Sequence, residues 1–310
     1  MKIIDGGVTS AKGFEAASAA AGIKYQGRTD MALVYSQKPC EAAGTFTTNV
    51  VKAAPVKWDK KVVESNVKPQ VVVINSGIAN ACTGETGMEC CKEVAKEAAK
   101  ALETEMESVL IGSTGVIGMQ LPVEKMKDGV HLLAKEKAEG LEMGNLAAKA
   151  IMTTDTKEKE AAVTIELDGT TVTIGGMAKG SGMIHPNMCT MLAFITTDAV
   201  ISKEALQAAL RSDVEETYNM ISVDGDTSTN DTVLLLANGM AGNKEIQKGT
   251  KEFEIFKEAL HEVNTALAKK IAGDGEGATA LLEVTVQGAE TKQQAKTLAK
   301  SVICSNLTKT

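Results

Sequence analysis

Strand-like and helix-like segments alternate along this chain in an irregular order, and that order most constrains the fold. Short apolar runs bounded by turn residues predict strands at 31–35, 71–75, 191–195, 233–236 and 280–286. Apolar residues at helical spacing predict helices at 86–103, 123–138, 202–220, 251–272 and 291–304. A doubly wound sheet needs a repeated strand, helix, strand order, so we predict layered α+β packing instead.

A hairpin over 161–176 is the clearest local prediction. Apolar and polar residues alternate up to Asp168-Gly169 and alternate again beyond it. Asp-Gly favours a two-residue turn in which both residues take a positive φ. We therefore expect two antiparallel strands joined at this dipeptide.

The length and composition predict a chain that buries a large core and divides into two domains. It has 310 residues, of which 44% are hydrophobic and 24% are charged. The formal net charge of −7 disfavours nucleic acid and anionic membranes as partners, because like charges repel. Aromatic residues make up only 3% of the chain, which disfavours base stacking. We therefore expect a small ligand that is recognised by polar groups.

Neither a membrane segment nor a metal framework is predicted. No apolar run reaches the roughly 18–20 residues that span a bilayer, and the first residues lack the apolar core of a signal peptide, so we expect a cytoplasmic protein. The six cysteines form no CxxC pair and are accompanied by only three histidines, which excludes a zinc or disulfide framework. Most of these cysteines are expected to be small buried residues.

Several familiar motifs are incomplete. GGMAKGSG at 175–182 lacks the Lys and Ser/Thr that complete a phosphate loop, and GDGEG at 273–277 is not GxGxxG. Asp224 and Asp226 begin like a calcium loop, but the required glycine and final glutamate are missing, so turn capping is the better interpretation. His185 lacks a GxSxG partner motif. Any chemistry is therefore expected to use backbone or terminal groups.

One stretch is dense in glycine and methionine and places a hydroxyl directly before an apolar run, MAKGSGMIHPNMCTML at 177–192. It resembles the self-cleavage motif of the ornithine acetyltransferase family, also called the bifunctional glutamate N-acetyltransferase of arginine biosynthesis. Other family-like motifs are GGVT at 6–9, FTTN at 46–49, AAPV at 53–56, NSG at 75–77 and ANACTG at 79–84. The resemblance covers essentially the whole chain. It implies an α/β/β/α sandwich, with two sheets between helices, and a smaller second α/β domain.

Members of that family cut themselves immediately before a threonine, which implies cleavage here between Cys189 and Thr190. The products would be an α-segment of residues 1–189 and a β-segment of residues 190–310. Thr190 would then carry a hydroxyl nucleophile and a free α-amine, whose ordinary pKa of about 7.7–8.0 suits a general base. Cys189 stands where the family usually has a small residue such as alanine, and we interpret it as a packing residue.

The resemblance also assigns the other site residues. Thr114 and Gly115, in GSTGVIG at 112–118, would form the oxyanion hole. The substrate would be bound by Thr153, Lys179, Thr190 and Glu276. A lysine can pair with the substrate carboxylate and a glutamate with its ammonium group. Without the resemblance, 112–118 would be a glycine-rich turn, and both charged residues would be solvated surface groups.

The implied reaction is ping-pong acetyl transfer from N-acetylornithine to Thr190 and then to glutamate. No metal or organic cofactor is implied, and acetyl-CoA stays open as a second acetyl donor. The two segments would assemble as a heterotetramer with two copies of each. One alternative is a self-processing N-terminal-nucleophile aminopeptidase or amidase, in which water accepts the acyl group. The other is an uncleaved inactive fragment.

The inactive alternative arises from the residues at 301–310. Family members continue beyond the corresponding position with an Asn-Trp-Gly-Arg-like segment and a C-terminal stretch that contacts the substrate. We therefore expect a chain that lacks the C-terminal region, and we assign no residues to those contacts.

Overall fold

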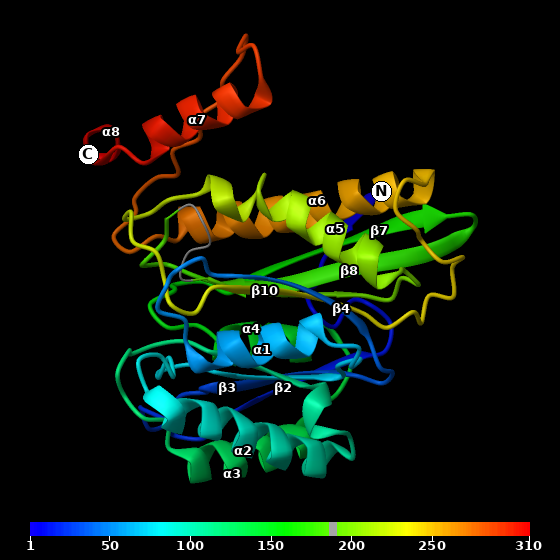
Figure 1. Ribbon diagram of the computed structural model, residues 1–310, viewed down its shortest axis with the longest axis vertical. Coiled ribbons are helices and arrows are strands. Elements are labelled where there is room, and N and C mark those ends of the chain that lie inside the picture. The colour runs from blue at the N-terminus through cyan, green and yellow to red at the C-terminus, as the bar shows by residue number, and fades with distance from the viewer. Residues whose placement is uncertain (186–190) are drawn as a thin grey trace.

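Two β-sheets lie between outer helices in the computed structural model, which describes residues 1–185 and 191–310 (Figure 1). The larger sheet has six strands in the order β1-β7-β8-β9-β10-β4. Their bounds are Lys2–Ile4 for β1, Lys159–Leu167 for β7, Thr170–Lys179 for β8, Leu192–Thr197 for β9, Thr232–Ala237 for β10 and Glu41–Phe46 for β4. The sheet therefore combines segments from both halves of the chain.

The smaller sheet has four strands in the order β2-β3-β5-β6. Their bounds are Phe14–Ala19 for β2, Met31–Ser36 for β3, Val71–Asn75 for β5 and Val109–Ser113 for β6. The two sheets pack directly on each other where Phe194 of β9 meets Gly112 of β6. A Cβ added at Gly112 would lie 2.9 Å from the Phe194 ring, so a glycine is needed for this close approach.

The predicted hairpin is confirmed. β7 and β8 pair antiparallel, and Leu167 lies opposite Thr170 across the turn. Asp168 and Gly169 have φ values of 49° and 81°, the positive values that a tight two-residue turn requires. β8 is ten residues long and begins at this turn, so Lys179 lies at the end of the strand that is farthest from the turn.

The outer helices complete the expected α/β/β/α layers, and two further helices lie between the sheets. Their bounds are Ala54–Glu64 for α1, Gly84–Leu102 for α2, Val123–Glu136 for α3, Leu141–Ala150 for α4, Lys203–Val214 for α5, Lys251–Gly273 for α6, Lys292–Ile303 for α7 and Asn306–Lys309 for α8. α5 and α6 pack on the larger sheet, whereas α2 and α3 pack on the smaller one (Figure 1). α1 contacts β4 and β6, and α4 contacts strands of both sheets, so these two helices lie between the sheets.

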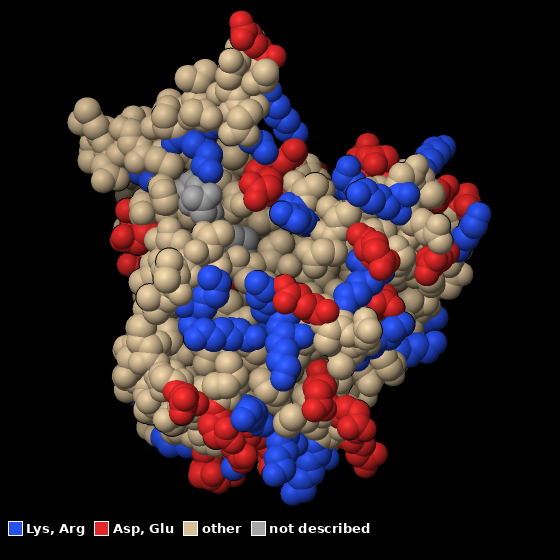
Figure 2. All heavy atoms as spheres, in the orientation of Figure 1, with Lys and Arg blue, Asp and Glu red and all other residues tan. Residues whose placement is uncertain are grey.

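α1 shows how the sequence separates core from surface. Val56, Val62 and Val63 are buried, whereas its lysines at positions 57, 60 and 61 are exposed. Charged side chains of both signs are mixed over the visible face of the molecule, and a band of Lys and Arg lies at the level of α1 (Figure 2). The surface lysines keep their charges in water while the apolar face of the helix contributes to the core.

Two expectations about secondary structure are wrong. The helix expected over 202–220 ends at Val214, and a short 3-10 turn, Tyr218–Met220, follows. The Thr217 hydroxyl donates to the Asp213 carbonyl at 2.8 Å, which satisfies an acceptor at the helix end, and the turn buries Tyr218. The strand expected over 280–286 is coil, because no strand of the described chain pairs with it.

The part of the chain after α6 contains coil and the helices α7 and α8, which stand beside the layered body (Figure 1). Its described residues, 274–310, form no strand, so this part is not in itself an α/β unit. Three of the cysteines, Cys40, Cys90 and Cys91, are buried as expected, whereas Cys82 is exposed. Within the described residues, every helix is too short or too polar to cross a bilayer.

Candidate active site

One cavity of about 640 Å³ brings together residues that are far apart in sequence. Its lining includes every described residue that the family resemblance assigns to the site, namely Thr114, Gly115, Thr153, Lys179 and Glu276. We call it the active-site cavity. Cys189 and Thr190, the expected cleavage site and nucleophile, lie outside the described residues.

The Thr114-Gly115 turn follows β6 and is hydrogen-bonded to the end of β5 and to the turn that follows it. Thr114 N–H donates to the Asn75 carbonyl at 3.0 Å, and Val116 N–H donates to the Gly77 carbonyl at 3.1 Å. Gly115 has a φ of +129°, and a Cβ there would lie 2.2 Å from the Gly77 carbonyl carbon. Only glycine fits this position, since the neighbouring atoms are backbone and cannot move aside.

Two hydrogen-bond donors of this turn have no partner among the described residues. Neither Gly115 N–H nor the Thr114 hydroxyl forms a hydrogen bond in this part of the chain. Both residues line the active-site cavity. Fixed donors of this kind can stabilise a developing oxyanion, because they need no rearrangement during the reaction.

Asn230 holds this turn in place, and the sequence reasoning missed it. The buried Asn230 side chain donates from Nδ2 to the Ser113 carbonyl at 2.8 Å and to the Ala79 carbonyl at 2.6 Å. Its neighbour Asp231 accepts from Met191 N–H at 3.2 Å. The segment before β10 thus connects the Thr114-Gly115 turn to the residue that follows Thr190. Only the polar run at 228–232 before an apolar strand hints at it.

A buried ionic network includes two of the residues that line the cavity, Thr153 and Lys179. The Lys179 ammonium donates to the Thr153 hydroxyl at 2.8 Å and lies 3.7 Å from Asp155 Oδ2. The Lys159 ammonium lies 2.8 Å from Asp155 Oδ1 and 2.6 Å from Asp274 Oδ2. Two lysines therefore face two aspartates, so the buried charges balance.

This network shifts the pKa values of its members. Burial by itself would raise the pKa of Asp155, but Lys179 and Lys159, with hydrogen bonds from Lys159 and the backbone, lower it to about 2. Burial lowers the pKa of Lys179, and the Asp155 carboxylate partly opposes that shift. Asp155 is therefore an ionised carboxylate at neutral pH and serves as the counter-ion for both lysines.

Glu276 is exposed at the edge of the cavity. Its N–H donates to the Ser181 carbonyl at 3.0 Å, and a Cβ added at Gly182 would lie 2.6 Å from its carboxyl carbon. The side chain therefore lies against Gly182. Glu276 is exposed, as expected for a surface charge, and it also lines the cavity.

The loop before the undescribed residues is capped by Asp224. The two oxygens of Asp224 accept from Met183 N–H at 2.5 Å and from Ile184 N–H at 2.9 Å. This confirms the turn-capping interpretation of Asp224. His185 Nδ1 lies 3.4 Å from the Ser222 hydroxyl. In the described part of the chain, no group of three or more His, Cys, Asp and Glu side chains is placed to hold a metal ion.

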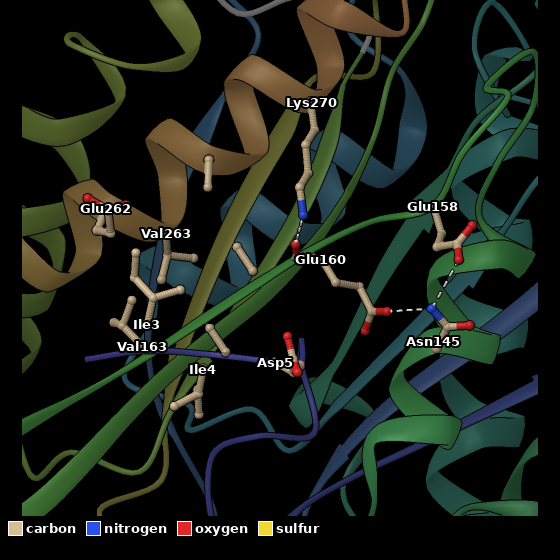
Figure 3. Close-up of a pocket in the computed structure, with 14 residues that line it drawn as sticks. Ile3, Ile4, Asp5, Asn145, Glu158, Glu160, Val163, Glu262, Val263 and Lys270 are labelled. Carbon is tan, nitrogen blue, oxygen red and sulfur yellow. Dashed lines mark hydrogen bonds between the residues drawn. The ribbon is translucent and has the colours of Figure 1, made fainter. Parts of the chain in front are cut away.

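A second hollow, of about 390 Å³, lies between β1, β7 and α6, and we call it the α6 hollow (Figure 3). Asn145 Nδ2 donates to Glu160 at 2.7 Å and to Glu158 at 3.4 Å. The Lys270 ammonium donates to the backbone carbonyl of Glu160 at 2.5 Å, and not to its carboxylate. None of the residues expected in the site lines this hollow.

Comparisons with known proteins agree with the resemblance seen in the sequence. Residues 15–310 match the ArgJ family. The arginine biosynthesis bifunctional protein ArgJ of Caldanaerobacter subterraneus subsp. tengcongensis is 52% identical over 310 residues, which are 100% of this chain and 76% of the relative.

Two solved structures are also similar. The ArgJ protein of Bacillus halodurans has a TM-score of 0.57 and 39% identity, over 60% of this chain and 96% of that chain. The ornithine acetyltransferase of Mycobacterium tuberculosis, solved with ornithine, has a TM-score of 0.55 and 41% identity, over 60% of this chain and 97% of that chain. This chain therefore belongs to the ArgJ family of arginine biosynthesis enzymes.

Proposed function

We propose that this enzyme transfers an acetyl group from N-acetylornithine to glutamate through an acetyl ester on Thr190. The observation that carries the proposal is the active-site cavity, whose lining brings Thr114 and Gly115 together with Lys179 and Glu276. Membership of the ArgJ family supports the reaction class. The proposal needs no metal or organic cofactor.

Maturation would first create the nucleophile. Thr190 Oγ attacks the Cys189 carbonyl, the peptide C–N bond breaks, and the released amine takes the hydroxyl proton. Water then hydrolyses the Cys189 ester, which leaves residues 1–189 with a new carboxylate and residues 190–310 with a free α-amine. That amine has an ordinary pKa of about 7.7–8.0, so it can accept a proton near neutral pH.

Acetyl transfer would then proceed in two balanced halves. The Thr190 amine removes the hydroxyl proton while Oγ attacks the acetyl carbonyl, and the resulting oxyanion accepts hydrogen bonds from Thr114 Oγ1 and Gly115 N–H. The bond from the acetyl carbon to the ornithine nitrogen breaks, and the Thr190 ammonium returns its proton to that nitrogen. Glutamate then attacks the ester through its amine, and Thr190 Oγ leaves with a proton.

The other cavity residues would orient the substrates. Lys179 pairs with the α-carboxylate, and Thr153, which accepts a hydrogen bond from Lys179 at 2.8 Å, contacts the same end of the substrate. Glu276 pairs with the side-chain ammonium of N-acetylornithine. We place the reaction in the cytoplasm, with the two segments assembled as a heterotetramer of two copies of each.

Steady-state kinetics with N-acetylornithine and glutamate test the proposal. We expect parallel lines in double-reciprocal plots, which indicate a ping-pong mechanism, and no transfer by Thr190→Ala. A Thr190→Ala variant that transfers acetyl at a near parental rate would contradict the proposal. Acetyl-CoA in place of N-acetylornithine would show in the same assay whether it serves as a second donor.

The same experiment separates the two alternatives. An aminopeptidase or amidase would release acetate at a rate that does not depend on glutamate, because water would accept the acyl group. An uncleaved inactive fragment would migrate as one chain and would transfer nothing. Glutamate-dependent formation of N-acetylglutamate by a cleaved protein would exclude both.

A further inference from the structure

We infer that Lys24 and Arg28 form a subsite for the side-chain carboxylate of the acetyl acceptor, an inference that rests on the proposed function. The two proposed substrates share an α-carboxylate and an α-nitrogen, but their side chains end in opposite charges. N-acetylornithine ends in an ammonium group, and glutamate ends in a second carboxylate. One cavity that serves both therefore needs an anion and a cation for the side chain, in addition to the group that binds the α-carboxylate.

Lys179 does not supply that additional cation. Its ammonium is buried, bonds to Thr153 and lies 3.7 Å from Asp155, whose carboxylate compensates its charge. The remaining cationic side chains that line the cavity are Lys24 and Arg28, both on the loop between β2 and β3. Glu276 and Asp226 supply anions in the same lining.

The loop that carries Lys24 and Arg28 is fixed to the body of the molecule. The buried carboxylate of Asp30 accepts from Ala21 N–H at 2.8 Å and from Ile23 N–H at 2.6 Å. The Lys125 ammonium donates to the Gly22 carbonyl at 2.6 Å. Ser76 N–H donates to the Asp30 carbonyl at 2.9 Å, which joins the loop to the turn after β5. A cation on this loop is therefore held at a defined place beside the cavity.

Both cations keep hydrogen-bonding capacity for a ligand. Arg28 Nη2 donates to the Met152 carbonyl at 2.5 Å and to the Thr153 carbonyl at 3.4 Å, which leaves other guanidinium N–H groups available. The Lys24 ammonium lies 4.8 Å from the centre of the Tyr25 ring. Within the described residues, neither cation pairs with a carboxylate. A ligand carboxylate would supply that missing charge.

Lys24 also lies close to the proposed reaction centre. A Cβ added at Gly77 would lie 3.1 Å from Lys24 Cβ, and Gly77 is the residue against which Gly115 packs. The loop therefore borders the Thr114-Gly115 turn directly. A glutamate whose amine faces that turn would have its side chain within the same cavity as both cations.

Competing acceptors test the subsite. Glutamine has the shape of glutamate without the side-chain charge, so the ratio of kcat/KM for glutamate to that for glutamine measures recognition of the carboxylate. We expect the parent enzyme to prefer glutamate, and Lys24→Gln and Arg28→Gln each to lower this ratio at least about tenfold, since each removes a charged partner. Lys100→Gln is the matched control, because Lys100 is a surface lysine on α2 with 76% of its side chain exposed.

The ratio is insensitive to a general loss of folded enzyme, since both acceptors are compared on the same preparation. An unchanged ratio in both variants, or no preference for glutamate in the parent, would overturn the subsite while transfer to glutamate continues. Transfer to neither acceptor by the parent would overturn the proposed function and the subsite with it.

Discussion

The active-site cavity and the α6 hollow contain similar side chains in different arrangements. Beside the cavity, the ammonium groups of Lys159 and of the lining residue Lys179 face the carboxylates of Asp155 and Asp274. In the α6 hollow, the Lys270 ammonium donates to a backbone carbonyl, and Glu160 Oε1 is buried with no hydrogen-bond partner among the described residues (Figure 3). Charge alone therefore does not distinguish a site.

Backbone geometry separates the two regions further. Gly115 lines the cavity in a conformation that only glycine tolerates, because an added Cβ would meet the backbone of Gly77. At Gly6 of the α6 hollow, the nearest atom to an added Cβ is the Ser10 hydroxyl, which belongs to a side chain. A candidate catalytic centre is therefore recognised by balanced buried charges together with a turn that neighbouring backbone holds in place. Matched changes in the two regions can test this comparison.

The largest expected difference is in stability. Asp155→Asn leaves two buried ammonium groups without their shared carboxylate, so we expect a loss of about 3–5 kcal/mol in the free energy of unfolding. Glu160→Gln replaces a carboxylate in which Oε1 has no hydrogen-bond partner among the described residues. We therefore expect the free energy of unfolding to change by less than about 1 kcal/mol. Urea unfolding monitored by circular dichroism measures both, and equal losses would contradict the comparison.

The next difference is in turnover. We expect Gly115→Ala to lower kcat by about 10²–10³-fold, because the new Cβ displaces an oxyanion donor. Gly6 lines the α6 hollow and also has a positive φ, of +138°, and a Cβ there would meet the Ser10 hydroxyl at 2.1 Å. Gly6→Ala should keep kcat within about twofold per folded molecule. A similar kcat for both variants would show that the turn is not an oxyanion hole.

The two lysines give a smaller contrast. Lys179→Met should lower kcat/KM for N-acetylornithine by about 10²-fold, because it removes the buried cation that we propose pairs with the substrate carboxylate. Lys270→Met should change kcat/KM by less than about twofold, since this ammonium contacts only a backbone carbonyl of the α6 hollow. Initial rates over a range of N-acetylornithine concentrations provide the measurement. Equal losses in the two variants would remove Lys179 from the site.

The smallest expected effect is in the pH dependence of stability. The pKa of Asp155 is about 2 in the folded protein against an ordinary 3.8, so its contribution is present above about pH 4 and is lost as the pH falls toward 2. We expect this contribution to be about 2 kcal/mol. Burial raises the pKa of Glu160, so its effect has the opposite sign and stability falls slightly as the pH rises.

Unfolding experiments from about pH 2 to pH 8 separate these two contributions. Asp155→Asn should flatten the acid limb of the stability curve, and Glu160→Gln should flatten the slight decline at higher pH. An unchanged acid limb in Asp155→Asn would contradict the shifted pKa of Asp155.

Local sequence signals predicted local structure well. The Asp168-Gly169 turn and the helix over 251–272 depend on neighbouring residues only, and both are confirmed. The prediction of a strand at 280–286 is wrong because a strand depends on a partner that alternation alone does not reveal. The helix expected to reach residue 220 ends early because Thr217 caps Asp213 and Tyr218 bonds to Asn264 of α6, a contact across 46 residues.

The candidate site also has residues that the sequence predicted and residues that only the fold reveals. Motif resemblance located Thr114, Gly115, Thr153, Lys179 and Glu276, and the fold brings them into one cavity. Asp274 and Asn230 could not be predicted, because their roles depend on partners more than 100 positions away in the sequence, Lys159 for Asp274 and Ser113 for Asn230. The partners of Asp155, Lys159 and Lys179, are nearer in the sequence, but only the fold shows that they share one carboxylate. Nothing in the local pattern distinguishes them from ordinary turn residues.

The mass of the segment 190–310 tests the central claim most directly. The purified protein is incubated with N-acetylornithine, denatured and measured by intact mass spectrometry, with and without a subsequent glutamate chase. We expect two fragments, residues 1–189 and 190–310, with the second heavier by one acetyl group before the chase and unmodified after it. A single uncut chain, or a cleaved protein that never gains an acetyl group, would contradict acetyl transfer through Thr190.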